Sequence, residues 1–330
     1  MLRFTNQQTA FVNQTRSLFN NQQASVAALL GSAALIGNAL PMPRDVWGEW
    51  DRDGVMIQRE VLSVFNDLAA TVSTPMPIGK LVRYFQTISD STDANISLDG
   101  RSKGRTDQEV YDYHGTPLPI IDTPFSYGWR QVQAAQTEGV ALDTAGRTNA
   151  MFKTAKKLES IALDGDSSIV VGSDPLYGLR THPKRNVRST GTALNGATGP
   201  EWLAEVNATT QLLYNDNAYA EPTLYVNIFD WKYARETDYS TQYPNKTIAQ
   251  RVLESGIQSV VPASDVSPGE LIAVIKSKQY VEVLNGMPIF TQPLFRPNPM
   301  DPYDFATMAA AAVQIKFDAD DNSGIAHSSL

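Results

Sequence analysis

The residues that could do chemistry in this chain are few and scattered. Its three histidines, His114, His182 and His327, lie far apart, and none has the spacing of a helical metal site such as H-E-x-x-H. There is no cysteine, which excludes thiolate nucleophiles, disulfides and cysteine-ligated metals. No G-x-S-x-G, G-x-G-x-x-G or phosphate-loop motif occurs. We therefore predict no catalytic, cofactor-binding or metal-binding residue, and place the histidines at the surface or at capping positions.

An acidic segment near the C-terminus has some features of a calcium-binding loop. Residues 318–324 read Asp-Ala-Asp-Asp-Asn-Ser-Gly. An EF-hand loop needs glycine at its sixth position and a bidentate glutamate at its twelfth. Here the glycine comes one place late and the twelfth position is Ser329. We interpret the segment as a polar turn after a strand.

Two further charged groups are open to a functional interpretation. One basic cluster consists of Arg180, Lys184, Arg185 and Arg188. It could contact nucleic acid or a neighbour's carboxylates, but a solvated loop is the favoured interpretation. Asp164 and Asp166 are a pair by proximity, and the end of a helix with Gly165 as a left-handed cap explains them.

The first 40 residues indicate a segment without a core of its own. Residues 1–25 are rich in asparagine and glutamine with a few interspersed apolar residues, which is typical of an extended arm that orders on contact, or of a disordered tail. Residues 24–40 lean apolar but include serine, glycine and asparagine, too polar and too short for a membrane span. We interpret them as a soluble helix or a loosely packed arm.

The next part of the chain predicts a hairpin between two helices. Apolar spacing from Asp53 or Gly54 through Leu68 predicts a short helix. Residues 78–121 alternate polar and apolar around two turn-forming clusters and show little sign of a core. Residues 125–163 contain no proline and follow a helical pattern that would run about 58 Å.

Two glycines in the long helix, and further helices and strands after residue 200, give the chain a mixed α+β pattern. Gly139 and Gly146 predict a bend or break in the long helix. Helices are expected at 200–214, around Trp231 and Tyr233, and at 247–255. Strands are expected at 223–228, 271–276 and 287–292, and an apolar terminal strand within 305–317. The predicted fold class is α+β.

Composition sets broad limits on the function. At 330 residues the chain is long enough for one large domain or two modest ones. Its formal net charge of −8 gives the chain as a whole no electrostatic footprint for nucleic acid. Neither a secretory signal nor a membrane span is indicated, so we expect a protein made in the cytoplasm.

Four short segments, in their order along the chain, carry a resemblance to a known family. They are Ile-Asp-Thr-Pro at 121–124, the stretch from Leu-Asp-Gly-Asp at 163–166 to Tyr-Gly-Leu at 177–179, Tyr-Pro-Asn-Lys-Thr-Ile at 243–248, and Phe-Asp at 317–318 with Gly-Ile-Ala-His at 324–327. With them the chain resembles a tailed-bacteriophage major capsid protein of the Hong Kong ninety-seven fold, a fold shared with encapsulin shells.

The resemblance implies a division of the chain. It implies a capsid fold with an N-terminal arm, an extended β-hairpin loop, a long spine helix in a peripheral domain, and a mixed α/β axial domain. The implied bounds are 1–48 for the arm, 49–77 for a short helix region of the peripheral domain, 78–124 for the extended loop, 125–199 for the peripheral domain with the spine helix, 200–295 for the axial domain, and 296–330 for the closing strand of the peripheral domain.

The resemblance also implies partners. Contact residues between subunits would be Arg83, Tyr84, Phe85, Arg101, Lys103 and Arg105, by their position in the loop. The chain would form hexamers and pentamers of an icosahedral shell, assembled in the host cytoplasm and carried in the virion. Scaffolding, portal and decoration proteins are further implied partners, and packaged double-stranded DNA would be contacted weakly and non-specifically. No membrane partner, cofactor or covalent crosslink is predicted.

Other functions remain open at this stage. An encapsulin-type compartment with a protein cargo belongs to the same class, and the packaged content separates it from a virion. An α+β enzyme with an unrecognised active site predicts instead a compact monomer or small oligomer.

Overall fold

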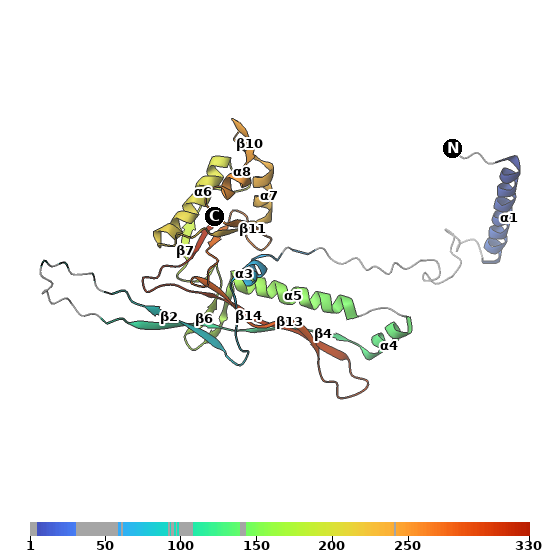
Figure 1. The fold of residues 1–330 in the computed structure, drawn as a ribbon. Helices are drawn as coiled ribbons and strands as arrows, with labels where there is room; N and C mark the ends of the chain where they lie inside the picture. Colours follow the sequence, from blue (N-terminus) through green and yellow to red (C-terminus); the bar gives the residue numbers. More distant parts are fainter. Residues whose placement is uncertain are drawn as a thin grey trace. The chain divides into compact units, whose positions relative to one another are not determined.

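The computed structural model describes residues 5–30, 59–60, 62–91, 93, 96, 98, 108–138, 143–240 and 242–330 (Figure 1). The chain divides into two units, Met1–Gln58 and Arg59–Leu330, and each is described by itself.

In the first unit the amide-rich segment forms helix α1 (Asn6–Leu30), so the expectation of an extended arm is wrong. The helix starts with a capping arrangement, because the Gln8 side chain accepts from the Thr5 backbone N–H at 2.9 Å while the Thr5 hydroxyl accepts from the Gln8 N–H. Glycine and proline are absent from this stretch, so nothing in it breaks the helix. The large apolar side chains Phe11, Val12, Leu18 and Phe19 are exposed.

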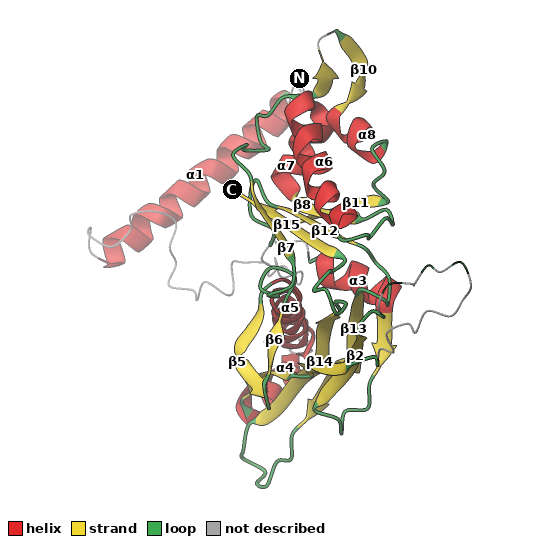
Figure 2. Cartoon of the chain, turned by 90° about the vertical axis from the view of Figure 1, so that its left-hand side faces the viewer, coloured by secondary structure: helices red, strands yellow, loops and turns green. Residues whose placement is uncertain are grey.

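The second unit contains a four-stranded sheet built around one long antiparallel pair. Strands β13 (Val281–Pro293) and β14 (Tyr303–Ile315) pair along their whole length. Strand β1 (Ser73–Pro75) lies parallel to β13, and β4 (Ile120–Tyr127) lies antiparallel to β14. The prediction of an apolar terminal strand within 305–317 is confirmed, since most of β14 is buried. Helices α3 (Val64–Val72) and α5 (Asp143–Leu163) pack on this sheet (Figure 2).

The long helix expected over 125–163 is shorter than predicted. Its first residues belong to β4, a short helix α4 (Trp129–Glu138) follows, and α5 begins at Asp143. The centroid of the Phe125 ring lies 5.1 Å from that of Phe305 in β14, and the two rings stack. Cross-strand pairing of β4 with β14 therefore outweighs the helix propensity of residues 125–127. Gly146 lies inside α5 without breaking it, and a Cβ there would stand 2.8 Å from the Tyr127 ring. Gly139 lies outside the described residues.

The short helix also begins later than predicted. Helix α3 starts at Val64, and Arg59 and Glu60 are not helical, while residues 51–58 lie outside the described residues. Its N-terminal N–H groups are satisfied from another element. The Glu159 carboxylate of α5 accepts from the backbone N–H groups of Val64 and Phe65, both at 2.8 Å. A buried carboxylate thus caps α3 in place of a local side chain.

Two hairpins lie beside the four-stranded sheet. Strands β2 (Val82–Ile88) and β3 (Tyr111–Pro117) pair antiparallel, which confirms the predicted hairpin base. Strands β5 (Gly165–Val171) and β6 (Asp174–Tyr177) form the second hairpin, directly after α5. Gly165 has φ of +69°, in the left-handed region predicted for a cap at this position.

A five-stranded sheet and three helices make up the remaining layer (Figure 2). Its strand order is β11 (Ser259–Ala263), β8 (Thr223–Asn227), β12 (Leu271–Val274), β15 (Ile325–Ser329) and β7 (Asn186–Ser189). Helices α6 (Gly199–Asn215), α7 (Ile228–Glu236) and α8 (Ile248–Leu253) bury their apolar faces on it, with the small pair β9 (Asp238–Ser240) and β10 (Tyr243–Thr247) beside them. Helices α6, α7 and α8 and strands β8 and β12 match elements expected from the sequence, whereas β7, β9, β10, β11 and β15 were not expected there. The fold class is α+β, as predicted.

Candidate functional site

The β2–β3 hairpin has two faces of different chemistry. Its register places Gln86 opposite Tyr113 and Ile88 opposite Tyr111. Because side chains alternate along a strand, one face collects Tyr84, Ile88, Tyr111 and Tyr113, which we call the outer face. All four side chains are at least half exposed. The Tyr111 hydroxyl donates to Glu109 at 2.9 Å, while the rings of this tyrosine-rich face remain exposed.

The opposite face of the hairpin packs on the chain's own sheet. The Phe85 ring lies edge-on to Phe317 at 5.5 Å, and His114 lies 4.6 Å from the same ring. Thr87 and Thr116, on the same face, are also buried. The expectation that residues 78–121 have little core therefore fails at the hairpin base. This attachment fixes the direction in which the outer face points.

Three of the six predicted contact residues lie in the described parts of the chain, and each has a different environment. The Arg83 guanidinium pairs with Glu282 of β13 at 3.1 Å, and Phe85 lies in the aromatic cluster just described. Tyr84 belongs to the outer face, with 59% of its surface exposed. Arg101, Lys103 and Arg105 lie outside the described residues. A contact role for any of the six stays a prediction.

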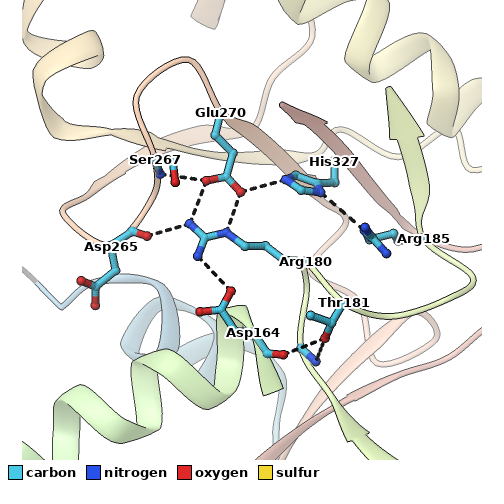
Figure 3. A network of polar contacts seen from close by, with 9 residues as sticks. Asp164, Arg180, Thr181, Arg185, Asp265, Ser267, Glu270 and His327 are labelled. Carbon is cyan, nitrogen blue, oxygen red and sulfur yellow. Dashed lines mark hydrogen bonds and ion pairs between the residues drawn. The ribbon is translucent and has the colours of Figure 1, made fainter. Parts of the chain in front are cut away.

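A buried ionic network joins the end of α5 to the five-stranded sheet of the second unit (Figure 3). The Glu270 carboxylate, just before β12, is 3% exposed. It accepts from Arg180 Nε at 2.6 Å and Arg180 Nη2 at 2.7 Å, a bidentate pair. His327 of β15 lies 2.8 Å from the same carboxylate, and the Ser267 backbone N–H donates to it at 2.8 Å.

Arg180 reaches this carboxylate because the chain after β6 is fastened to the end of α5. The Arg180 backbone N–H donates to the Leu163 carbonyl at 2.7 Å, and its Nη1 donates to Asp164 at 3.0 Å. Its Nη2 also donates to the Asp265 carbonyl at 2.6 Å. One guanidinium thus ties α5 to the loop before β12. The network therefore holds the layer of α5 against the five-stranded sheet.

The electrostatics favour the ionised carboxylate. Burial opposes the charge of Glu270, but hydrogen bonds from His327 and Arg180 outweigh it and lower the pKa of Glu270 to about 2. The His327 ring donates through Nε2 to Glu270, while Nδ1 accepts from Arg185 Nε at 3.4 Å. Both oxygens of Glu270 and both ring nitrogens of His327 are hydrogen-bonded to protein groups, so the network has the chemistry of a structural contact between elements.

The histidines do not lie where the sequence predicted. His182 and His327 are buried, and His114 packs against Phe317. Burial lowers the pKa of His182 to about 4, with Arg185 and Lys184 adding to the effect. The surface or capping interpretation is therefore wrong for His182 and His327. Nothing in their spacing marked them, since their partners come from other elements.

The basic cluster is paired within its own chain, which corrects the interpretation as a solvated loop. Arg180 binds Glu270, Lys184 Nζ pairs with Asp321 at 2.5 Å, and Arg188 pairs with Glu205. These carboxylates come from other parts of the fold and neutralise three of the four basic side chains. Arg185 donates instead to the His182 carbonyl and to His327 Nδ1.

The calcium-like segment is a polar turn, as interpreted from the sequence. Asp318 accepts from the backbone N–H groups of Asp320 and Asn322 at 3.0 and 2.8 Å, and Phe317 bridges Ser323. Within the described parts of the chain, no group of three or more His, Cys, Asp or Glu side chains could hold a metal ion. No helix among the described residues is long and apolar enough to cross a membrane.

Comparison with known families assigns the chain. A family model described as a family of unknown function (DUF6260) matches residues 34–328. The chain belongs to this family. No curated protein matches this DUF6260 member in sequence.

Solved structures share the fold of this DUF6260 member. The capsid of Myoviridae phage XM1 matches with a TM-score of 0.71 at 8% identity, covering 89% of this chain and 99% of that chain. A Mycobacterium phage Adephagia chain matches with a TM-score of 0.61 at 10% identity, over 88% and 98%. A virus-like particle from Pyrococcus furiosus matches with a TM-score of 0.53 at 15% identity, over 76% and 90%. The predicted capsid fold, shared with encapsulin-like particles, is confirmed.

Proposed function

We propose that this chain is the major capsid protein of a tailed bacteriophage, a structural subunit that assembles into hexamers and pentamers of an icosahedral shell around the genome. The observation that carries the proposal is the outer face of the β2–β3 hairpin, presented on a fold shared with phage capsid subunits. The role is structural and not enzymatic, and the mature protein resides in the virion after assembly in the host cytoplasm.

The outer face has the chemistry of a protein contact. Tyr84, Tyr111 and Tyr113 are large, amphipathic side chains, the type enriched at interface hot spots. Together with Ile88 they form an apolar patch that water solvates poorly. The inner face already packs on the chain's own β14, so this patch is free to take a second copy. A contact between different surfaces of two copies is heterologous and closes into rings.

Each segment of the chain is assigned to one part of a capsid subunit. We assign 1–48 to an arm, 49–77 and 125–199 to a peripheral domain with α5 as its spine helix, and 78–124 to the extended loop over a neighbouring subunit. We place 200–280 and β15 in the axial domain at the capsomer centre, in place of the predicted 200–295, and β13 and β14 in the peripheral domain, because these two strands pair along their whole length. Arg83, Tyr84, Phe85, Arg101, Lys103 and Arg105 are the proposed loop contacts.

The charge of the chain suits a container for DNA. The formal net charge is −8, and three of the four clustered basic side chains at 180–188 are paired with carboxylates of the same chain. Binding to DNA depends on free cationic groups that neutralise phosphates. We therefore propose weak, non-specific contact with packaged DNA, with scaffolding, portal and decoration proteins as additional partners.

The test replaces one outer-face tyrosine and leaves the rest of the chain intact. The expressed chain is examined by sizing chromatography and negative-stain microscopy, and should form rings or shells. Tyr113→Asp places a charge at the centre of the outer face and should leave smaller species. The matched control is Tyr219→Asp, a comparably exposed tyrosine outside the hairpin, which should still assemble. A parent chain that stays monomeric with a scaffold protein present would overturn the proposal.

A protein-filled compartment is the second candidate, favoured by the similarity to the Pyrococcus furiosus virus-like particle. The content of purified particles separates the two candidates. Double-stranded DNA protected from nuclease supports the virion, and a discrete co-purified protein supports the compartment.

A further inference from the structure

The turn that joins β13 to β14 is built to hold its shape. In residues 294–302 the Asp301 carboxylate accepts from the Asn298 backbone N–H at 2.9 Å and from its side-chain amide at 3.0 Å. The Leu294 N–H donates to the Asp304 carbonyl at 2.8 Å, and Arg296 stacks over the Tyr303 ring at 4.0 Å. Prolines at positions 297, 299 and 302 restrict the backbone further.

This ordered turn presents two apolar side chains to solvent. Phe295 is 91% exposed and Met300 is 74% exposed, and we call this pair the tip. The fixed turn prevents the tip from collapsing onto its own strands. An apolar anchor held out by a rigid frame is the type of feature that dominates binding at protein interfaces.

An apolar groove lies on the same sheet, between α3, α5 and β13. Its walls include Phe65, Ala69, Leu158, Met287 and Ile289, its volume is about 120 Å³, and Asn66, Glu159 and Asn285 also line it. A cavity of about 150 Å³ lined by such side chains binds benzene. The groove is somewhat smaller than that cavity, and its apolar walls offer a phenyl ring contacts of the same kind.

The tip of one molecule cannot reach the groove of the same molecule. Ile289 and Phe295 lie on the same strand or its continuation, six residues apart, which is about 20 Å at the rise of a strand. The paired ladder of β13 and β14 keeps that distance fixed. Any Phe295 ring that fills the groove must come from another copy.

We propose that the tip of one copy inserts Phe295 into the α3–α5 groove of a second copy. This inference rests on the proposed shell function and adds a second contact, separate from the outer face of the hairpin. Each copy then carries one tip and one groove, so the contact is heterologous and links copies head to tail around a symmetry axis.

The absence of native cysteine makes disulfide trapping a direct test. The double variant Phe295→Cys with Ala69→Cys is oxidised in assembled particles and analysed by non-reducing electrophoresis. A disulfide forms only when the two Cβ atoms come within about 4.5 Å. We expect a ladder of covalently linked chains, and its largest member gives the number of copies around the axis.

Single-cysteine variants control for other contacts. A mixture of Phe295→Cys chains with Ala69→Cys chains should give covalent dimers and no larger species. Dimers from Phe295→Cys alone would show that tips meet tips and would overturn the inference. Shells that form without a ladder would also overturn it while leaving the proposed function intact, whereas absence of any shell argues against the proposed function itself.

A truncation measures the energetic role of the tip. Phe295→Ala should raise the protein concentration needed for assembly about tenfold, as loss of an interface hot-spot side chain would. The matched control is Phe229→Ala, another exposed phenylalanine, on α7, which should assemble like the parent. Equal assembly of Phe295→Ala and the parent would contradict the inference.

Discussion

Glu270→Gln removes the charge at the centre of the buried ionic network of Arg180, Glu270 and His327 while keeping the side chain's size. Glu270 accepts four hydrogen bonds, two from Arg180 and one each from His327 and Ser267. An amide offers one acceptor oxygen and turns its N–H₂ group toward other donors. The variant therefore removes the buried, bidentate ion-pair partner of Arg180 and leaves the guanidinium only the more exposed Asp164.

The magnitude follows from the carboxylate's pKa. Folding lowers the pKa of Glu270 from its ordinary value of 4.5 to about 2. At about 1.36 kcal/mol per pKa unit this corresponds to about 3 kcal/mol of folding stability at neutral pH. Removal of one partner from a buried ion pair costs about 3–5 kcal/mol, which agrees. We expect Glu270→Gln to lower the free energy of unfolding by about 3 kcal/mol.

The pH dependence gives a second, independent measurement. Because the pKa of Glu270 is lower in the folded chain than in the unfolded chain, its contribution is complete above about pH 4.5. It is lost as the pH falls toward about 2. The difference between parent and variant should therefore be largest at pH 7 and shrink steadily below pH 4.5.

The assay is urea denaturation at low protein concentration, followed by circular dichroism between pH 3 and pH 7. Glu236→Gln is the control, an exposed carboxylate paired with Lys232 on α7, and should change stability by less than about 0.5 kcal/mol. A Glu270→Gln variant as stable as the parent at pH 7, or a difference that does not shrink in acid, would refute the reasoning.

Two further predictions concern the packing of α5. Glu159→Gln turns an amide N–H₂ toward the N-terminus of α3 and should lower the free energy of unfolding by about 1–3 kcal/mol, measured by urea denaturation. Gly165→Ala should destabilise more than Gly172→Ala, although both have φ of +69°. A Cβ at Gly165 would stand 2.6 Å from the Gly178 nitrogen, whereas Gly172 faces open space, so the control should lose only about 1–2 kcal/mol. Equal melting temperatures for the two glycine variants would contradict this account.

Much of the fold could be predicted because local patterns agree with the tertiary structure. The alternation that predicted the hairpin matches the register from Val82 to Ile88, and Gly165 takes the left-handed conformation expected after a helix. The expectation failed where long-range pairing decides the local structure. Residues 125–127 have no helix breaker, yet they pair with β14 as a strand.

The buried ionic network of Arg180, Glu270 and His327 could not be predicted from the sequence. Glu270 lies 90 residues from Arg180 and 57 from His327, so no local spacing links them. Glu159 is likewise buried against α3, about 95 residues earlier in the chain, and no local spacing links the two. Both sites depend on how separate elements pack, and a single sequence does not encode that in its periodicity.

The most direct test of the central claim is electron microscopy of particles formed by the full chain, at a resolution that traces the backbone. The account predicts a closed shell in which the Tyr84–Tyr113 face of each hairpin is covered by another copy of the chain. A particle in which that face points to solvent, or a chain that never associates, would contradict the account.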